Sequence, residues 1–245
     1  MIDTLNTILN IKTLQACKWL LVLIVFLDII KLNAQGQYVF SQKEKNNFSL
    51  FSSGKATPLY TSNIDYPGVI RALGDLQSDL SRVTDVKPEL FIEKEPADAE
   101  LVIAGTIGRN KWIDQLIQNK KLNANKVTGR WETYVIQVIE NPFPKVKRAL
   151  IIARSDKRGT IYGIYDISKQ IGVSPWYWWA DVPPKKSKNL FVTPGPHTLG
   201  EPLVKYRGIF INDEAPALSG WRKNSPTHLT NLRDSTIFFM GRYSN

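Results

Sequence analysis

Hydrophobic and polar positions divide most of the chain into strand-like and helix-like segments. Short apolar runs rich in β-branched and aromatic residues predict strands, whereas apolar residues spaced three and four apart predict amphipathic helices. By these patterns, strands are expected at 38–40, 48–51, 57–60, 90–92, 101–104, 131–139, 149–153 and 190–192, the last as an edge strand. Helices are expected at about 67–83, 111–119 and 160–170. Strands that alternate with amphipathic helices predict an α/β fold, in which helices cover a sheet.

Turn and capping residues mark where these elements begin and end. Asp65 is expected to cap the first helix, and Pro67 stands in its first turn, where a missing N–H costs little. Gly172 is expected to end the third helix in the left-handed conformation. The run Pro194-Gly195-Pro196 interrupts the pattern, so we expect a domain boundary near it. A further strand is expected at 204–211, beyond that boundary.

The first 34 residues have the order of features found in a secretory signal. Lysines precede the apolar run 19–30, and the small-residue exit Leu32-Asn33-Ala34 follows it. A membrane anchor is the alternative, but a spanning helix needs roughly 20 apolar residues, and Asp28 interrupts this run. We therefore expect cleavage between Ala34 and Gln35, and an exported protein, periplasmic or secreted, that has no membrane part once the signal is removed.

Composition narrows the classes of chemistry and of partner. Cys17 is the only cysteine and lies within the expected signal, so disulfides and thiolate catalysis are excluded for the mature chain. The net charge is +10 for the whole chain and +9 without the signal, which favours anionic partners. No nucleic-acid recognition motif is present, so nucleic acid is not an expected partner. The clusters Lys145-Lys147-Arg148 and Lys185-Lys186-Lys188 are interpreted as solvated loop faces.

Several well-known catalytic constellations are absent from the sequence. There is no G-x-S-x-G motif, and His197 and His228 are the only histidines, so a serine triad has little support. No cluster of histidines and carboxylates has the spacing of metal ligands. The run Gly105-Thr106-Ile107-Gly108 lacks the third glycine of a dinucleotide-binding loop and is interpreted as a tight turn. The sequence therefore predicts neither a metal site nor a cofactor.

Two segments remain as candidates for a binding or catalytic site. The first contains four consecutive aromatic residues at 176–179, among them Trp178, which is a candidate for stacking on sugar rings. The alternative, which we favour, is that these rings attach one domain to its neighbour. The second is the strand at 204–211, which leads into Asn212-Asp213-Glu214 as the first strand of a (β/α)₈ barrel would lead into its active site. An Asx turn that caps a following helix would use the same residues, and the spacing leaves both readings open.

The sequence resembles the glycoside hydrolase family 115 enzymes, the xylan α-glucuronidases, from about Tyr38 to Trp221. The stretches that carry the resemblance are 68–72 with Asp75-Leu76, 159–165, 174–183 and 205–221. It implies an N-terminal α/β sandwich-like domain with a mixed sheet, followed by a (β/α)₈ barrel. It also implies removal of glucuronic acid or its 4-O-methyl ether from plant glucuronoxylan with inversion, which requires a general acid and a general base.

The resemblance implies roles for residues near the start of the barrel. Asn212 and Asp213 lie where this family's barrel begins to contribute to the pocket, which makes Asp213 the catalytic candidate. Asn212, Glu214 and Trp178 are the candidates for substrate binding.

The chain departs from the family pattern after Trp221, where residues 222–245 form a polar, basic stretch. We therefore expect four parts: a signal at 1–34, an α/β domain at 35–195, a linker with the first strand of an incomplete barrel at 196–221, and a divergent, disordered tail at 222–245. Such a truncated portion is expected to be inactive alone. The alternative is a small secreted module without catalysis that binds acidic polysaccharide through its charge and tryptophans.

Overall fold

The computed structural model describes residues 36–94, 99–123, 125, 128–174, 177, 181–204 and 206. The chain divides into two compact units, Met1–Gln37 and Tyr38–Asn245, and the structure described below belongs to the second. The expected signal, Trp178, the strand residues from 207 onward and the tail at 222–245 lie outside the described residues. Within the described ranges, no helix has both the length and the apolar character needed to span a membrane.

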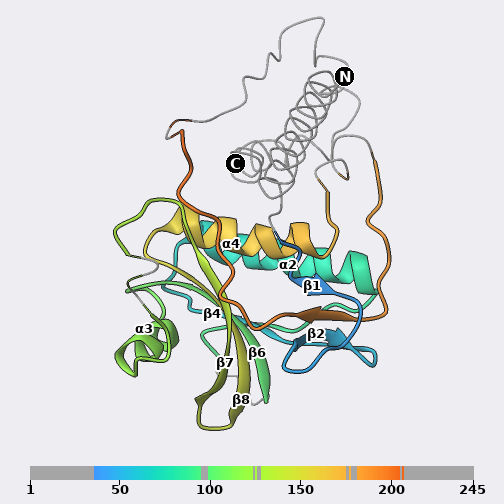
Figure 1. Cartoon of the computed structure of the whole chain (residues 1–245), viewed down its shortest axis with the longest axis horizontal. Coiled ribbons are helices and arrows are strands. Elements are labelled where there is room, and N and C mark those ends of the chain that lie inside the picture. Colours follow the sequence, from blue (N-terminus) through green and yellow to red (C-terminus); the bar gives the residue numbers. More distant parts are fainter. Residues whose placement is uncertain are drawn as a thin grey trace, which may run out of the picture. The chain divides into compact units, whose positions relative to one another are not determined.

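A five-stranded mixed sheet forms the centre of the domain (Figure 1). Its strand order is β5 (Leu90–Ile92), β4 (Leu59–Thr61), β6 (Glu100–Thr106), β8 (Val146–Arg154) and β7 (Val135–Phe143). The first four of these strands are parallel, and β7 pairs with β8 in the antiparallel direction. The α/β fold with a mixed sheet that the sequence predicts is therefore confirmed.

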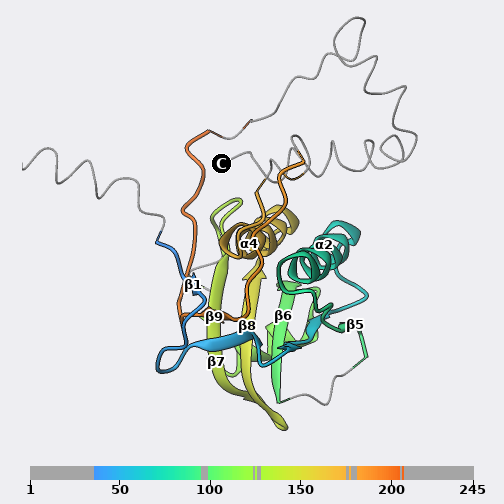
Figure 2. The same cartoon turned by 90° about the vertical axis from the view of Figure 1, so that its right-hand side faces the viewer.

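Helices cover both faces of this sheet. Figure 2 shows α2 (Pro67–Thr84) and α4 (Lys157–Gln170) side by side, and both pack on one face, while α3 (Lys111–Gln118) packs on the other. Alternate residues of a strand point to opposite faces, so Leu150 and Ile152 join the α2–α4 core while Ile151 and Ala153 join the α3 core. All four are fully buried, and burying a side chain of the leucine or isoleucine class contributes about 1.5–3 kcal/mol.

A small antiparallel sheet shares the core beneath α2 and α4. Its order is β1 (Val39–Phe40), β9 (Leu190–Val192), β2 (Phe48–Ser52) and β3 (Lys55–Ala56). The prediction that 190–192 forms an edge strand is wrong, because β9 pairs with β1 on one side and with β2 on the other. All three of its residues are buried, as an apolar run without polar alternation requires of an interior strand.

Three predicted boundaries differ from the structure. Asp65 does not cap α2, whose N-cap is Tyr66 without a side-chain hydrogen bond. Helix α4 begins at Lys157, three residues earlier than expected, because the side chain of Asp156 caps it. Strand β7 runs from Val135 to Phe143 rather than over the expected 131–139, and its register is irregular beyond Glu140. The end of α4 is confirmed, since Gly172 has a φ of +96°.

Candidate functional site

The carboxyl ends of the parallel strands meet at one edge of the large sheet. Thr61, Thr106 and Arg154 end β4, β6 and β8 there. The chain leaves β4 into a helix on one face and leaves β6 into a helix on the other face. Open α/β sheets hold their ligands outside the strand ends at such a reversal. This carboxyl edge is therefore the first place to look for chemistry among the described residues.

Asp65 joins the ends of β4 and β6. Its side chain is buried and accepts hydrogen bonds from the backbone N–H of Thr106 and of Tyr66, each at 2.7 Å. Burial raises the pKa of Asp65, and the hydrogen bonds from Thr106 and Tyr66 together with the Arg109 charge oppose that rise. The guanidinium of Arg109 lies 4.1 Å above the ring of Tyr66. Both carboxylate oxygens of Asp65 are thus engaged by backbone donors.

Glu93 makes a second connection, from the end of β5 to the loop after β4. Its carboxylate accepts a hydrogen bond from the Ser62 hydroxyl at 2.9 Å and one from the Asn63 N–H at 3.4 Å. The ammonium of Lys111, the first residue of α3, lies 3.5 Å from the other oxygen. The Ser62 hydrogen bond is the main cause that lowers the pKa of Glu93.

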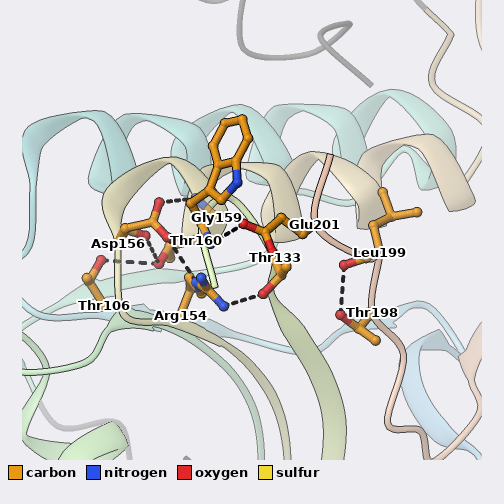
Figure 3. Close-up of polar contacts among 10 residues, drawn as sticks. Thr106, Thr133, Arg154, Asp156, Gly159, Thr160, Thr198, Leu199 and Glu201 are labelled. Atoms are coloured by element: carbon orange, nitrogen blue, oxygen red, sulfur yellow. Dashed lines mark hydrogen bonds and ion pairs between the residues drawn. The ribbon is translucent and has the colours of Figure 1, made fainter. Parts of the chain in front are cut away.

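Arg154 is the centre of a buried network at the first turn of α4 (Figure 3). Its side chain is fully buried, its Nε–H donates to Asp156 Oδ2 at 2.9 Å, and its Nη1–H donates to the Thr133 hydroxyl. The other oxygen of Asp156 accepts from the Gly159 N–H at 2.8 Å and so caps the helix. The network joins β8, α4 and the segment before β7.

Gly159 allows the segment before β7 to lie directly against the helix. A Cβ atom at this position would come closer than 3.0 Å to the Thr133 carbonyl oxygen and to Cγ of Arg154. The first atom belongs to backbone and the second to a fully buried side chain, so neither moves freely. The glycine is therefore needed for close approach.

Two further carboxylates lie around the same helix turn. Glu132 is buried and has a φ of +55°, and it accepts a hydrogen bond from Arg158 at 2.9 Å. Glu201 accepts a hydrogen bond from the N–H of Trp131 at 3.4 Å. Figure 3 shows Glu201 close to Thr133 and Gly159. This contact holds the segment after β9 against the segment before β7.

The carboxylates of the carboxyl edge are engaged by groups of the domain itself. A glycosidase that inverts needs one carboxyl group as acid and another as base, with a water between them and the sugar. Asp65, Glu132 and Asp156 each bind an arginine or backbone N–H groups of the domain itself. Among the described residues, no group of three His, Cys, Asp or Glu side chains is arranged to hold a metal ion. The edge thus connects β4, β5, β6 and β8 with α3 and α4.

The predicted site residues Asn212, Asp213, Glu214 and Trp178 lie outside the described residues. Val204, where the expected barrel strand begins, is in no strand. Of the aromatic run, Tyr177 is described, and the guanidinium of Arg82 lies 4.8 Å from its ring centroid. That contact joins the aromatic run to the last turn of α2.

The chain was compared with known families, curated proteins and solved structures. The model of glycosyl hydrolase family 115 matches residues 199–238. A solved enzyme, described as "a novel family GH115 4-O-methyl-alpha-glucuronidase, BtGH115A, with specificity for decorated arabinogalactans", is 34% identical to this chain with a TM-score of 0.57. The alignment covers 73% of this chain. The chain carries the N-terminal portion of a glycoside hydrolase of family 115. The comparison with curated proteins gave no significant match.

The family 115 match adds two facts to what the sequence alone predicts. It covers Asn212, Asp213 and Glu214, and it continues past Trp221, where the resemblance was expected to end, as far as residue 238. The chain spans 22% of the length of BtGH115A.

Sequence reasoning missed the carboxyl-edge network. The sequence signals for this network were local and weak. Asp156 stands three residues before Gly159 at the start of α4, and Asp65 stands before a helix that begins with Pro67. The partner of Asp65 is 41 residues away in the chain, and periodicity carries no information about such a pair.

Proposed function

We propose that this chain supplies the N-terminal α/β domain of a hydrolase that releases glucuronic acid, or its 4-O-methyl ether, from plant polysaccharide with inversion. The observation that carries the proposal is the 34% identity with a solved 4-O-methyl-α-glucuronidase over 73% of the chain. That enzyme is described as specific for decorated arabinogalactans, whereas the sequence motifs suggest glucuronoxylan. The uronic acid side chain is common to both, so we propose it as the recognised group.

We propose further that the described domain does not perform the chemistry. The carboxylates Asp65, Glu132 and Asp156 at its carboxyl edge are engaged by arginines and backbone N–H groups, and a carboxylate held in this way is a poor proton donor or acceptor for a substrate. The catalytic role then falls to Asp213, which orients the sugar by accepting hydrogen bonds from its hydroxyl groups or helps to position the attacking water. Asn212, Glu214 and Trp178 bind the sugar.

An exchange of domains tests the proposal. Residues 38–204 would replace the equivalent N-terminal portion of BtGH115A, and release of 4-O-methylglucuronic acid would be measured by chromatography on glucuronoxylan and on decorated arabinogalactan. We expect the chimera to keep its activity, because this chain is 34% identical to BtGH115A over 73% of its length and is similar to it in fold, with a TM-score of 0.57. A chimera that folds but releases no uronic acid would overturn the proposed role.

The 245-residue protein provides the second arm. We expect it to release no more uronic acid than its own Asp213→Ala variant. Turnover that disappears in this variant would mean that the chain holds a complete catalytic site, and the division of roles would be wrong.

A further inference from the structure

An open depression of about 710 Å³ lies at the end of the large sheet opposite the carboxyl edge. It is formed by the end of α3 and by the turn between β7 and β8, a hairpin that extends away from α2 and α4 in Figures 1 and 2. The residues that line it are Gln115, Asn119, Lys121, Asn141, Pro142, Phe143, Pro144, Lys145, Val146 and Lys147.

The charge of this depression is positive. Three of its lining residues are lysines and none is a carboxylate. Lys145 and Lys147 are exposed, and neither forms an ion pair with a described residue. The neighbouring Arg148 differs, since its guanidinium lies 2.7 Å from Glu140 and 3.8 Å from Glu100. The basic cluster read from the sequence is therefore not uniform: Arg148 is paired inside the domain, and the two lysines face the depression.

The walls of the depression are held in place by the fold. The ammonium of Lys121 donates hydrogen bonds to the carbonyl oxygens of Asn141 and Pro142 and so ties the hairpin to the end of α3. The ring of Phe143 lies 4.8 Å from that of Trp112, tilted by 43°. The backbone N–H of Lys147 donates to the Ala99 carbonyl at 2.7 Å. A ligand would thus meet a surface that is already ordered, which reduces the entropy lost on binding.

The chemistry of the lining matches a carboxylated sugar. Pro144 is exposed and Phe143 is half-buried, and both offer apolar surface of the kind that packs against the C–H side of a sugar ring. The amides of Gln115, Asn119 and Asn141 can both donate to and accept from hydroxyl groups. The lysine ammonium groups supply charge for a carboxylate.

We propose that this depression binds a uronic acid side chain of the polysaccharide. The choice of ligand rests on the proposed function, whereas the site itself rests on the lining residues. Such a site would hold the polymer on the enzyme while other side chains are cleaved. Because the lysines are exposed and ion pairs of this kind are individually weak, we expect the loss of both Lys145 and Lys147 to weaken binding about tenfold.

The experiment is a titration of the 245-residue protein by calorimetry at 0.1 M salt. The ligands are a xylo-oligosaccharide with one 4-O-methylglucuronic acid side chain and the same oligosaccharide without it. The test variant is K145Q/K147Q. The control variant is K185Q/K188Q, which removes the same charge at two exposed lysines of the other basic cluster. Amide chemical shifts of the unmodified protein then locate the contact independently of any variant.

The expected result is binding of the acidic oligosaccharide alone, weakened about tenfold in K145Q/K147Q and unchanged in K185Q/K188Q, with shifts at Asn141, Lys145 and Lys147. Equal weakening in both variants would mean general charge attraction and would overturn the site. Equal binding of the neutral oligosaccharide, or no binding, would also overturn it. The titration measures no hydrolysis, so the two proposals can fail separately. If the BtGH115A chimera is active but the oligosaccharide does not bind, only the site is refuted. If the chimera folds but is inactive, the proposed function is refuted.

Discussion

The substitution Gly159→Ala tests whether the network at the start of α4 is as close-packed as the structure indicates. Glycine inside a helix is ordinarily unfavourable, and replacing it by alanine stabilises a helix by about 0.8–1.0 kcal/mol. Gly159 lies in the first turn of α4. Propensity alone therefore predicts that the alanine variant is more stable than the original protein.

The geometry predicts the opposite sign. The added Cβ would lie within 3.0 Å of the Thr133 carbonyl oxygen and of Arg154 Cγ. Neither neighbour yields easily, because Arg154 binds both Asp156 and the Thr133 hydroxyl, and the adjacent Glu132 binds Arg158. Overpacking of this kind costs about 1–3 kcal/mol. Both contacts would fall well below 3.0 Å, which places the cost in the upper part of that range, about 2–3 kcal/mol. After subtracting the gain in helix propensity, we expect Gly159→Ala to lower the free energy of unfolding by about 1–2 kcal/mol.

Gly74 in α2 is the matched control. It is also helical, but a Cβ there would have no atom within 4 Å, so Gly74→Ala should stabilise the protein by about 0.8–1.0 kcal/mol. Urea unfolding followed by tryptophan fluorescence measures both. With a slope of about 2 kcal/mol per molar urea, the two variants should shift the midpoint by roughly half a molar in opposite directions. A Gly159→Ala variant as stable as the unsubstituted protein would refute the packing argument.

Two further predictions concern the carboxyl edge and the N-terminus. Burial raises the pKa of Asp65 in the folded protein, so the stability that Asp65 contributes falls as pH rises from 3.8 towards that raised pKa. The hydrogen bond from Ser62 lowers the pKa of Glu93 in the folded protein, so the stability that Glu93 contributes is lost as pH falls from 4.5 through that lowered pKa. Carboxyl-carbon NMR titration should find Asp65 above 3.8 and Glu93 below 4.5, and Asp65 titrating below its ordinary value would contradict the burial argument. We also predict that the exported protein begins at Gln35, which intact-mass measurement would check; a form that keeps residues 19–30 would mean a membrane anchor instead.

Helices and their buried faces were predictable because their signal is local. Helical spacing predicts one buried face for α2, and all of its members except the half-buried Ile70 are fully buried in the structure: Val69, Ile70, Leu73, Leu76, Leu80 and Val83. The start of α2 at its proline was equally clear, because proline fits the first turn of a helix and little else inside one.

The remaining features depend on contacts between residues that are distant in the chain. The residues next to Asp65 in the sequence predict that it caps a helix. Its carboxylate instead accepts a hydrogen bond from the Thr106 N–H, at the end of another strand. The sequence 190–192 shows that a strand is apolar but not that it lies between β1 and β2. Arg154 ends an apolar strand, where a charge suggests exposure, and only the positions of Asp156 and Thr133 explain its burial.

Under the proposed function, the α/β domain influences catalysis by fixing the point where the catalytic segment begins. The family 115 match begins at residue 199, and the backbone just before it is paired with β7: Ile136 and His197 exchange hydrogen bonds at 2.8 and 2.7 Å. The ring of His197 also stacks on Tyr38 at 4.1 Å, and Glu201 binds the Trp131 N–H. The chain therefore leaves the sheet from a position that is held on several sides, and the free edge of β7 is covered at the same time. Because a displacement of about 1 Å at a catalytic group can reduce the rate roughly a hundredfold, we propose that these contacts are the means by which the α/β domain affects hydrolysis in the proposed enzyme.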